Sequence, residues 1–171
     1  MDASTYFVGL MKKHLSVLKP NQRFAYLVRL LWGSPYGWGK EVMGDVDCSG
    51  SVCWSLYLLG YNIRMTADDF YRLATNPTDT LPEPGNLCFW WFPTRKRIKH
   101  VTVFSDKMVV MDADEHFQDI PVSLEIQTRE KQPFEFRKFD WNKLKVMSDT
   151  GEFAWGVDSE LKPLFGLFEI S

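Results

Sequence analysis

The sequence lacks the features that mark disulfide-rich, metal-binding and membrane-spanning proteins. It has only three cysteines, Cys48, Cys53 and Cys88, an odd number without the spacing of paired metal ligands, so neither a disulfide framework nor a cysteine metal site is expected. No run of 18 apolar residues occurs, which leaves no candidate membrane span. The first 18 residues carry Asp2, have no basic region before their short apolar stretch and have no small-residue cleavage site, unlike a signal peptide. We therefore expect a cytoplasmic chain, unless something other than a standard export signal moves it.

The sequence also lacks a large excess of charge of either sign. The 20 basic and 22 acidic residues are interspersed and give a formal net charge of -2, so neither nucleic acid nor an anionic membrane is an expected partner. The exception is the cluster Arg95-Lys96-Arg97-Ile98-Lys99, which runs directly into His100. Two interpretations stay open for it: a solvated loop between strands, or a subsite for an anionic substrate.

The first half of the chain reads as helical. A length of 171 residues predicts one domain, 1–171. Helical periodicity covers 4–18 and 22–32, with Pro20 ending the first helix and Asn21 capping the second. After a Gly-, Pro- and Trp-bearing loop over 33–44, the apolar stretch that follows Cys48 predicts a central buried helix, ended by Gly60. Thr66, followed by acidic residues, predicts the cap of a short helix.

The second half reads as strands. Alternating apolar and β-branched residues, with a turn at 105–107, predict strands over 87–92, 100–104, 108–111 and 134–139, and further strands over 144–146 and 164–170. Helices followed by an antiparallel sheet predict an α+β fold.

One cysteine stands where a reactive thiolate is favoured. Cys48 begins the central helix, and a helix N-terminus favours negative charge. His100 opens a β-branched run, and Asp112 follows at a spacing that an antiparallel return brings back beside it. These residues supply a nucleophile, a base and a group that orients the base, and the Cys48 N–H is placed to bind an oxyanion.

Each of these residues also has a plain structural interpretation. Cys48 is then a packed thiol, as we expect for Cys53 and Cys88, His100 a surface residue, and Asp112 part of a charged loop. His116 competes with Asp112 for the orienting role. Spacing alone does not decide between an enzyme and a structural protein.

Four strings read together add a resemblance. They are Ser34-Pro35-Tyr36-Gly37-Trp38-Gly39, Asp47-Cys48-Ser49-Gly50, Pro84-Gly85-Asn86-Leu87-Cys88-Phe89-Trp90 and His100-Val101-Thr102-Val103-Phe104. In order and spacing the chain resembles the NlpC/P60 family of papain-like cysteine peptidases, over about residues 30 to 113. Lys40, Asn86 and Thr102 depart from the family pattern, which is typical of a divergent branch.

The resemblance implies roles for individual residues. Cys48 resembles the family nucleophile, His100 the general base and Asp112 the third polar residue, a place where family members often have histidine. The residues that it implies around the substrate are Tyr36, near the nucleophile and the oxyanion, Asp47, which meets a substrate amino group, and Ser49, Arg64 and Thr66 in the same cleft.

The function expected from this resemblance is hydrolysis of an amide bond in a bacterial cell-wall stem peptide, next to γ-D-glutamyl, through a Cys48 thioacyl intermediate. No metal or cofactor is implied. The absence of a signal peptide favours a phage-tail or lysis-associated hydrolase, with phage tail proteins as partners, or an enzyme that recycles wall peptides. Two alternatives remain: an amidase or acyltransferase on the same scaffold, and a phage structural or binding module with a vestigial site.

Overall fold

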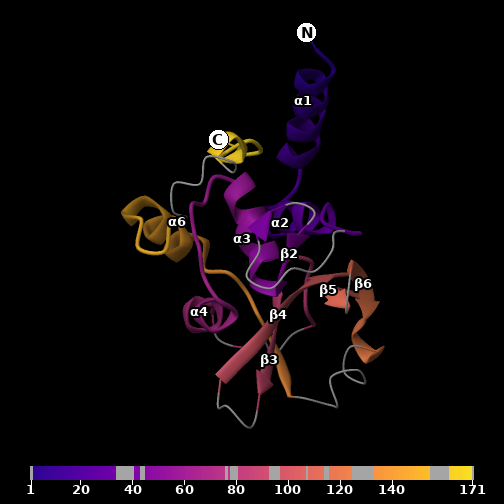
Figure 1. Cartoon of the computed structure of the whole chain (residues 1–171), viewed down its shortest axis with the longest axis vertical. Helices are drawn as coiled ribbons and strands as arrows, with labels where there is room; N and C mark the ends of the chain where they lie inside the picture. Colours follow the sequence, from indigo (N-terminus) through magenta and orange to yellow (C-terminus); the bar gives the residue numbers. More distant parts are fainter. Residues whose placement is uncertain are drawn as a thin grey trace.

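Two helices begin the chain. The computed structural model describes residues 2–33, 41–42, 45–75, 77, 81–92, 97–106, 108–113, 116–124, 133–154 and 162–170, with backbone alone at 41–42, 45–46, 92, 110–113 and 116–117. Helices α1 (Ala3–Ser16) and α2 (Pro20–Arg29) confirm the two predicted helices. Helix α1 projects from the body (Figure 1). Its buried residues, Met11 and Leu15, lie in its C-terminal half.

The predicted cap of α2 at Asn21 is wrong. The N-cap is Lys19, and its N–H donates to Gln22 Oε1 at 2.9 Å. Pro20 occupies the first helical position instead of ending the preceding helix. Proline suits this position because the first turn of a helix has no intrahelical acceptor for its N–H in any case.

Helix α3 (Cys48–Leu58) is the predicted central helix, and every residue from Ser49 to Leu58 is buried. Its serines direct their hydroxyls to the helix itself: Ser51 Oγ donates to the Cys48 carbonyl at 2.7 Å, and Ser55 Oγ to the Ser51 carbonyl at 2.9 Å. A polar side chain satisfied in this way can be buried at small cost.

Short elements flank α3 on both sides. The predicted loop 33–44 is partly wrong, because β1 (Glu41–Val42) pairs with β2 (Asp45–Val46) in an antiparallel ribbon, and β1 contacts α3. After α3 comes α4 (Ala67–Leu73), with Thr66 as its N-cap, as predicted.

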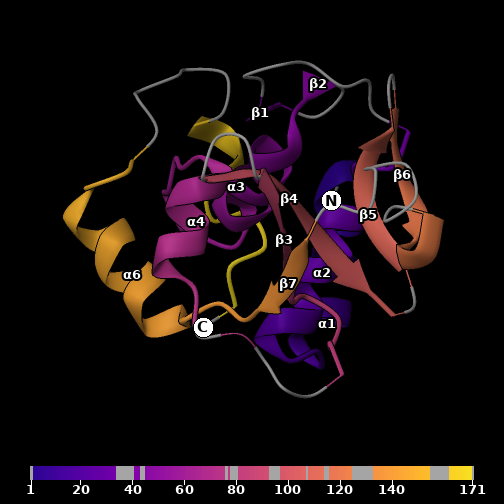
Figure 2. The same cartoon turned by 90° about the horizontal axis from the view of Figure 1, so that it is seen from below.

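A five-stranded antiparallel sheet follows, in the order β6-β5-β4-β3-β7. Its strands are β3 (Leu87–Phe92), β4 (Arg97–Ser105), β5 (Met108–Ala113), β6 (His116–Pro121) and β7 (Phe134–Arg137). The strands predicted over 87–92, 100–104, 108–111 and 134–139 are confirmed, although β4 begins three residues earlier than expected and β7 ends at Arg137; β6 was not predicted. Figure 2 shows β5 and β6 at the edge far from α6. Ser105 pairs with Met108, which confirms the predicted hairpin turn.

The register between β3 and β4 changes once. Trp90 pairs with His100, whereas Trp91 pairs with Ile98, so Lys99 is an extra residue in β4. A β-bulge of this kind bends the strand and redirects nearby side chains. It lies immediately before His100.

The main core lies between the helices and one face of the sheet. Leu27 of α2, Leu56 of α3 and Phe70 of α4 are buried together with Phe89 and Val101 of the sheet. A smaller cluster, Phe104, Val109 and Ile120, joins β4, β5 and β6. Helices α2, α3 and α4 all contact β4, which makes it the central strand of the packing.

One backbone contact joins α2 to the loop before β3. Gly85 has φ +92°, and a Cβ at this position would stand 2.7 Å from the carbonyl carbon and 2.9 Å from the Cα of Asn21. No L side chain fits there without moving one of the two backbones.

The C-terminal third differs from the prediction. Residues 144–146 are not a strand but part of α6 (Trp141–Thr150), because the Asp140 carboxylate accepts from the Lys143 N–H at 3.0 Å and Gly151 ends the helix at φ +70°. Residues 164–170 are not a strand either. The segment after the 3-10 turn η2 (Lys162–Leu164) meets the end of α3, where the Phe168 N–H donates to the Leu58 carbonyl at 2.9 Å. Among the helices described, none is both long and apolar enough to cross a bilayer.

Candidate active site

The N-terminus of α3 carries the predicted nucleophile. Asp47 caps the helix: its Oδ1 accepts from the Gly50 N–H at 2.6 Å and from Ser49 Oγ at 3.3 Å. Cys48 is the first helical residue and is half-buried, whereas Cys53 and Cys88 are fully buried, as predicted for structural thiols. None of these three cysteines, all of which the structure describes, forms a disulfide. The most accessible thiol therefore stands at a helix N-terminus, where a thiolate is favoured.

A cavity of about 320 Å³ opens beside Cys48. Five predicted site residues line it together: Asp47, Cys48, Ser49, Arg64 and Thr66. They come from the start of α3 and from the segment that leads into α4. The fold thus brings into one cleft residues that lie up to 19 positions apart in the sequence.

Arg64 is held from both sides of its chain segment. Its backbone N–H donates to the Phe153 carbonyl, and the Asn62 N–H donates to Ser148 Oγ at 2.8 Å. One residue further on, the Met65 N–H lies 3.4 Å from the Cys53 sulfur inside α3. This segment is therefore fixed between the central helix and the C-terminal part of the chain.

Thr66 uses its hydroxyl for capping. Thr66 Oγ1 accepts from the Asp69 N–H at 3.2 Å and lies 2.8 Å from Asp69 Oδ2, which also accepts from the Thr66 N–H at 3.0 Å. These bonds form a reciprocal capping box. The residue lines the cleft, and its role toward substrate stays a prediction.

His100 is buried in β4, with 6% of its surface exposed, and it directly follows the cavity residue Lys99. This burial contradicts the alternative interpretation of His100 as a surface residue. Because α3 contacts β4, the fold brings the elements of the predicted nucleophile and base together. The pairing of the Cys48 and His100 side chains stays a prediction.

The remaining predicted residues are described less fully. Asp112 lies in β5 and pairs with Phe117. Since β5 runs antiparallel to β4 from the pair Ser105–Met108, Asp112 lies toward the same end of the two strands as His100. The side chains of Asp112 and His116, and the whole of Tyr36, lie outside the described residues.

Comparisons with known proteins identify the family and the fold. The family model of NlpC/P60 matches residues 33–133, more than half of the chain. The chain belongs to the NlpC/P60 family. No curated protein sequence matches it.

Solved structures of NlpC/P60 proteins share the fold. NlpC1 from Trichomonas vaginalis is 17% identical at a TM-score of 0.58, covering 70% of this chain and 43% of its own. The NlpC/p60 domain of the peptidoglycan hydrolase SagA is 19% identical at a TM-score of 0.56, and the match covers 69% of this chain and 98% of that domain. An NlpC/P60 protein from Bacillus cereus ATCC 10987 is 18% identical at a TM-score of 0.57, and the match covers 71% of this chain and 40% of that protein. The chain thus spans less than half the length of two of these proteins, and identities this low establish the fold alone.

In this NlpC/P60 domain the cleft also contains residues that the sequence analysis did not assign. Asp68 lines the cavity and joins α4 to β4: its Oδ1 accepts from the Ile98 N–H at 3.4 Å, and its Oδ2 pairs with Arg72 Nη2 at 2.7 Å. From the sequence, Asp68 was expected only as an acidic residue in the first turn of α4. Its position four residues before Arg72 was the available signal for the ion pair.

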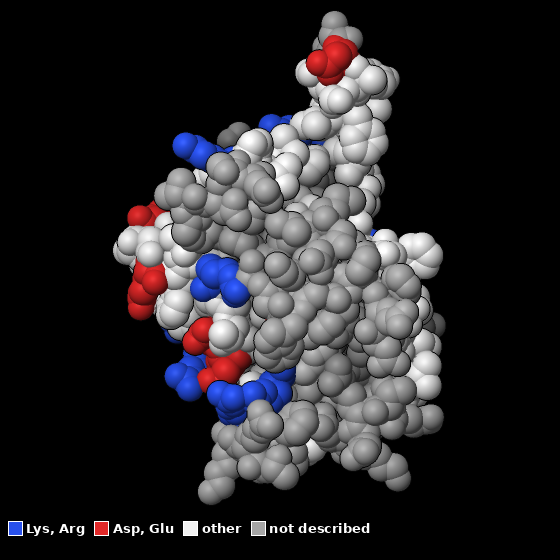
Figure 3. Space-filling model, in the orientation of Figure 1, with Lys and Arg blue, Asp and Glu red and all other residues white. Residues whose placement is uncertain are grey.

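The structure describes three residues of the basic cluster, Arg97, Ile98 and Lys99. Arg97 and Lys99 are strand residues of β4 that line the cavity, which fits the subsite interpretation better than a solvated loop. Arg95 and Lys96 lie outside the described residues. Figure 3 shows basic and acidic side chains side by side over α4, so this part of the surface carries both signs of charge. Within the described ranges, no group of three or more His, Cys, Asp or Glu side chains is arranged to hold a metal ion.

Proposed function

We propose that the protein is a cysteine peptidase that hydrolyses an amide bond in bacterial cell-wall stem peptides, with Cys48 as nucleophile. The observation that carries this proposal is the position of Cys48, half-buried and lining a cavity at the capped N-terminus of a buried helix. A thiol that served packing alone would resemble Cys53, which is fully buried within the same helix.

In the proposed mechanism, His100 takes the proton of the Cys48 thiol, the resulting thiolate attacks the substrate carbonyl carbon, and the carbonyl oxygen becomes an oxyanion. The backbone N–H groups in the first turn of a helix have no carbonyl acceptor within the helix, because no earlier turn exists. Such N–H groups stabilise an oxyanion. His100, as general acid, gives a proton to the leaving amine when the C–N bond breaks. Water activated by His100 then attacks the thioester, which releases the acid and restores the thiol. Asp112 is the proposed partner that orients His100.

Substrate binding is proposed for the residues that share the cavity. Asp47 offers a carboxylate beside Cys48 for the amino group of a stem peptide, because a carboxylate accepts several hydrogen bonds and the helix cap engages Oδ1. Arg64 and Ser49 line the same cavity. Tyr36 is proposed as an aromatic contact near the nucleophile.

The substrate class rests on family membership. A structural neighbour, SagA, is named as a peptidoglycan hydrolase, and we propose the same polymer here, with cleavage next to γ-D-glutamyl. We also propose that residues 1–171 act as one catalytic domain, because the main core draws side chains from Met11 through to Phe168.

The deciding experiment compares wild type, Cys48→Ser and Cys48→Ala on purified muropeptides by mass spectrometry. Cleavage in the wild type that both variants lose, with unchanged circular dichroism and melting temperature, supports the proposal. A product that carries an added amine acceptor instead of water indicates an acyltransferase. No cleavage, together with a Cys48 that reacts with iodoacetamide no faster than glutathione, contradicts the peptidase and favours a binding module.

A further inference from the structure

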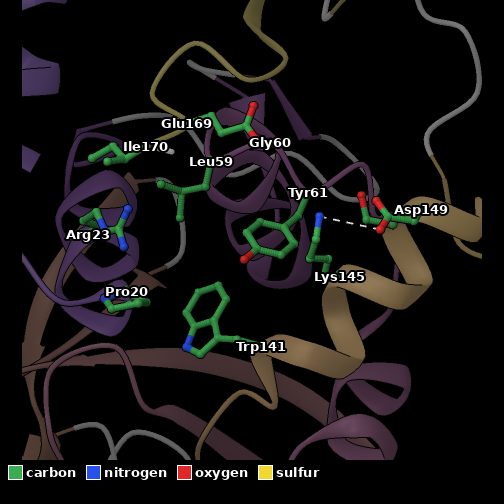
Figure 4. Close-up of a pocket in the computed structure, with 11 residues that line it drawn as sticks. Pro20, Arg23, Leu59, Gly60, Tyr61, Trp141, Lys145, Asp149, Glu169 and Ile170 are labelled. Carbon is green, nitrogen blue, oxygen red and sulfur yellow. Dashed lines mark ion pairs between the residues drawn. The ribbon is translucent and has the colours of Figure 1, made fainter. Parts of the chain in front are cut away.

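A second cavity, of about 310 Å³, lies at the opposite end of α3 from Cys48. Its walls come from α2, from the turn after α3, from α6 and from the C-terminal segment (Figure 4). Because α3 has 11 residues and a helix rises 1.5 Å per residue, about 16 Å of helix separates this cavity from the catalytic cleft. The cavity is therefore a separate site.

Among the residues that the structure describes, one basic side chain of this cavity has no acceptor. Lys145 Nζ pairs with Asp149 Oδ2 at 3.6 Å, as the dashed line in Figure 4 marks. Arg23 has no ion pair within the described ranges, and its Nε is buried without a hydrogen-bond acceptor there. Figure 4 shows Arg23 on α2, across the cavity from Tyr61 and Trp141. A buried guanidinium N–H without an acceptor is costly, and an entering anion relieves that cost.

Two aromatic side chains form the facing wall. The Trp141 indole N–H donates to Asn21 Oδ1 at 2.8 Å, which fixes the ring, and the Tyr61 ring centroid lies 5.5 Å from that of Trp141. The Tyr61 hydroxyl points into the cavity (Figure 4). Burial raises the pKa of Tyr61 above its ordinary value of 10.0. The hydroxyl is therefore protonated at neutral pH and is a second donor.

We propose that this cavity is a second binding site, which takes a small ligand with a carboxylate next to an apolar side chain. The carboxylate pairs with Arg23 and accepts from the Tyr61 hydroxyl, while the apolar side chain packs on Trp141. The volume lies at the lower end of small-molecule sites, which limits the ligand to about one or two residues. A free amino acid and the C-terminal residue of a peptide share this chemistry.

The experiment titrates the ¹⁵N-labelled full chain carrying Cys48→Ala, so that no ligand is cleaved. The probes are phenylalanine, phenylalaninamide and the dipeptide Ala-Phe, and the readout is the Trp141 indole N–H resonance, assigned with Trp141→Phe. We expect the two carboxylates to shift this resonance and the amide to bind at least about tenfold more weakly, which is the usual effect of a charge-assisted hydrogen bond. Tighter binding of Ala-Phe identifies a peptide end, and tighter binding of phenylalanine a free amino acid.

Variants test the role of Arg23. Arg23→Gln is expected to weaken binding of the carboxylates about tenfold or more. Arg29→Gln, on the same helix but paired with Asp119 at 2.6 Å, is expected to leave binding unchanged. Where Arg23→Gln does not fold, Tyr61→Phe and the amide probe still decide. Equal binding of acid and amide, equal binding by Arg23→Gln, or no shift at Trp141 with any probe overturns the proposal, whatever the result at Cys48.

Discussion

The backbone N–H of Arg64 donates a hydrogen bond to the carbonyl of Phe153. Arg64 lines the cleft beside Cys48, whereas Phe153 lies 20 residues beyond the end of the family match at residue 133. The Asn62 N–H adds a second bond, to Ser148 Oγ. The C-terminal part of this chain therefore supports a wall of the cleft that the family region forms.

Removing this support is expected to reduce both stability and cleavage. Ser148→Ala leaves the half-buried Asn62 N–H without its acceptor, at a cost of about 1 kcal/mol in the free energy of unfolding. We also expect kcat/KM to fall severalfold, because Arg64 is less firmly placed. Thr150→Ala in the same helix, whose exposed hydroxyl donates only to the Met147 carbonyl, is the control. Equal activity of the two variants in a muropeptide assay would contradict the coupling.

Asp47 has a structural and a proposed binding role that two substitutions separate. Asp47→Asn keeps a good N-cap, so the free energy of unfolding is expected to stay within about 0.5 kcal/mol, whereas Asp47→Ala costs about 1 kcal/mol. If the carboxylate binds the substrate amino group, both variants lose about tenfold or more in kcat/KM. Urea unfolding and kinetics on the same samples check this. If Asp47→Asn keeps full activity, Asp47 caps α3 but its carboxylate does not bind the substrate amino group.

Two glycines give opposite expectations for the same substitution. Gly85 has φ +92°, and Gly85→Ala adds a Cβ that clashes with the Asn21 backbone. This change is expected to lower the free energy of unfolding by about 2 to 4 kcal/mol. Gly9→Ala in α1, where nothing lies within 4 Å of the new Cβ, is expected to stabilise the protein by about 0.5 to 1 kcal/mol. Urea unfolding midpoints measure both effects, and a stable Gly85→Ala would show that the α2 contact is not as close as described.

Alkaline pH is expected to destabilise the fold through two tyrosines. Burial raises the pKa of Tyr61, and hydrogen bonding to Glu135 raises that of Tyr71. A raised pKa means that the folded state holds the proton more tightly than the unfolded chain. The free energy of unfolding is therefore unaffected by these groups below pH 10 and falls above it. Urea midpoints across pH 9 to 11.5 test this: Tyr61→Phe should make the decline shallower, and Tyr6→Phe, exposed on α1, should not.

Much of the fold was predictable because local patterns and tertiary packing agree. The apolar stretch after Cys48 predicted α3, and Thr66 predicted the cap of α4. The failures come from short segments. Residues 144–146 alternate like a strand, but they lie inside a helix that Asp140 caps at its start and Gly151 ends. These two end residues outweigh the short alternating pattern. Residues 164–170 are apolar because they cover the end of α3, which no local pattern reveals.

The site was predictable to the extent that motifs carry it. Resemblance to the family named five residues that share one cavity, but it gave no sign of Asp68, whose bond to the Ile98 N–H depends on how α4 meets β4. The bulge at Lys99 was equally invisible, since strand register is set by pairing between distant segments. The support of Arg64 by Phe153 is a contact of the same kind.

The burial of α3 on every side has a dynamic consequence. Because no face of α3 is exposed to solvent, its backbone amides exchange with water only when the core around them opens. Among the helices described, α3 is buried over the whole of Ser49 to Leu58, and Asp47 caps the end at which Cys48 meets the cleft. The thiol is therefore held in position by the stability of the core, and it is displaced only when the core around α3 opens.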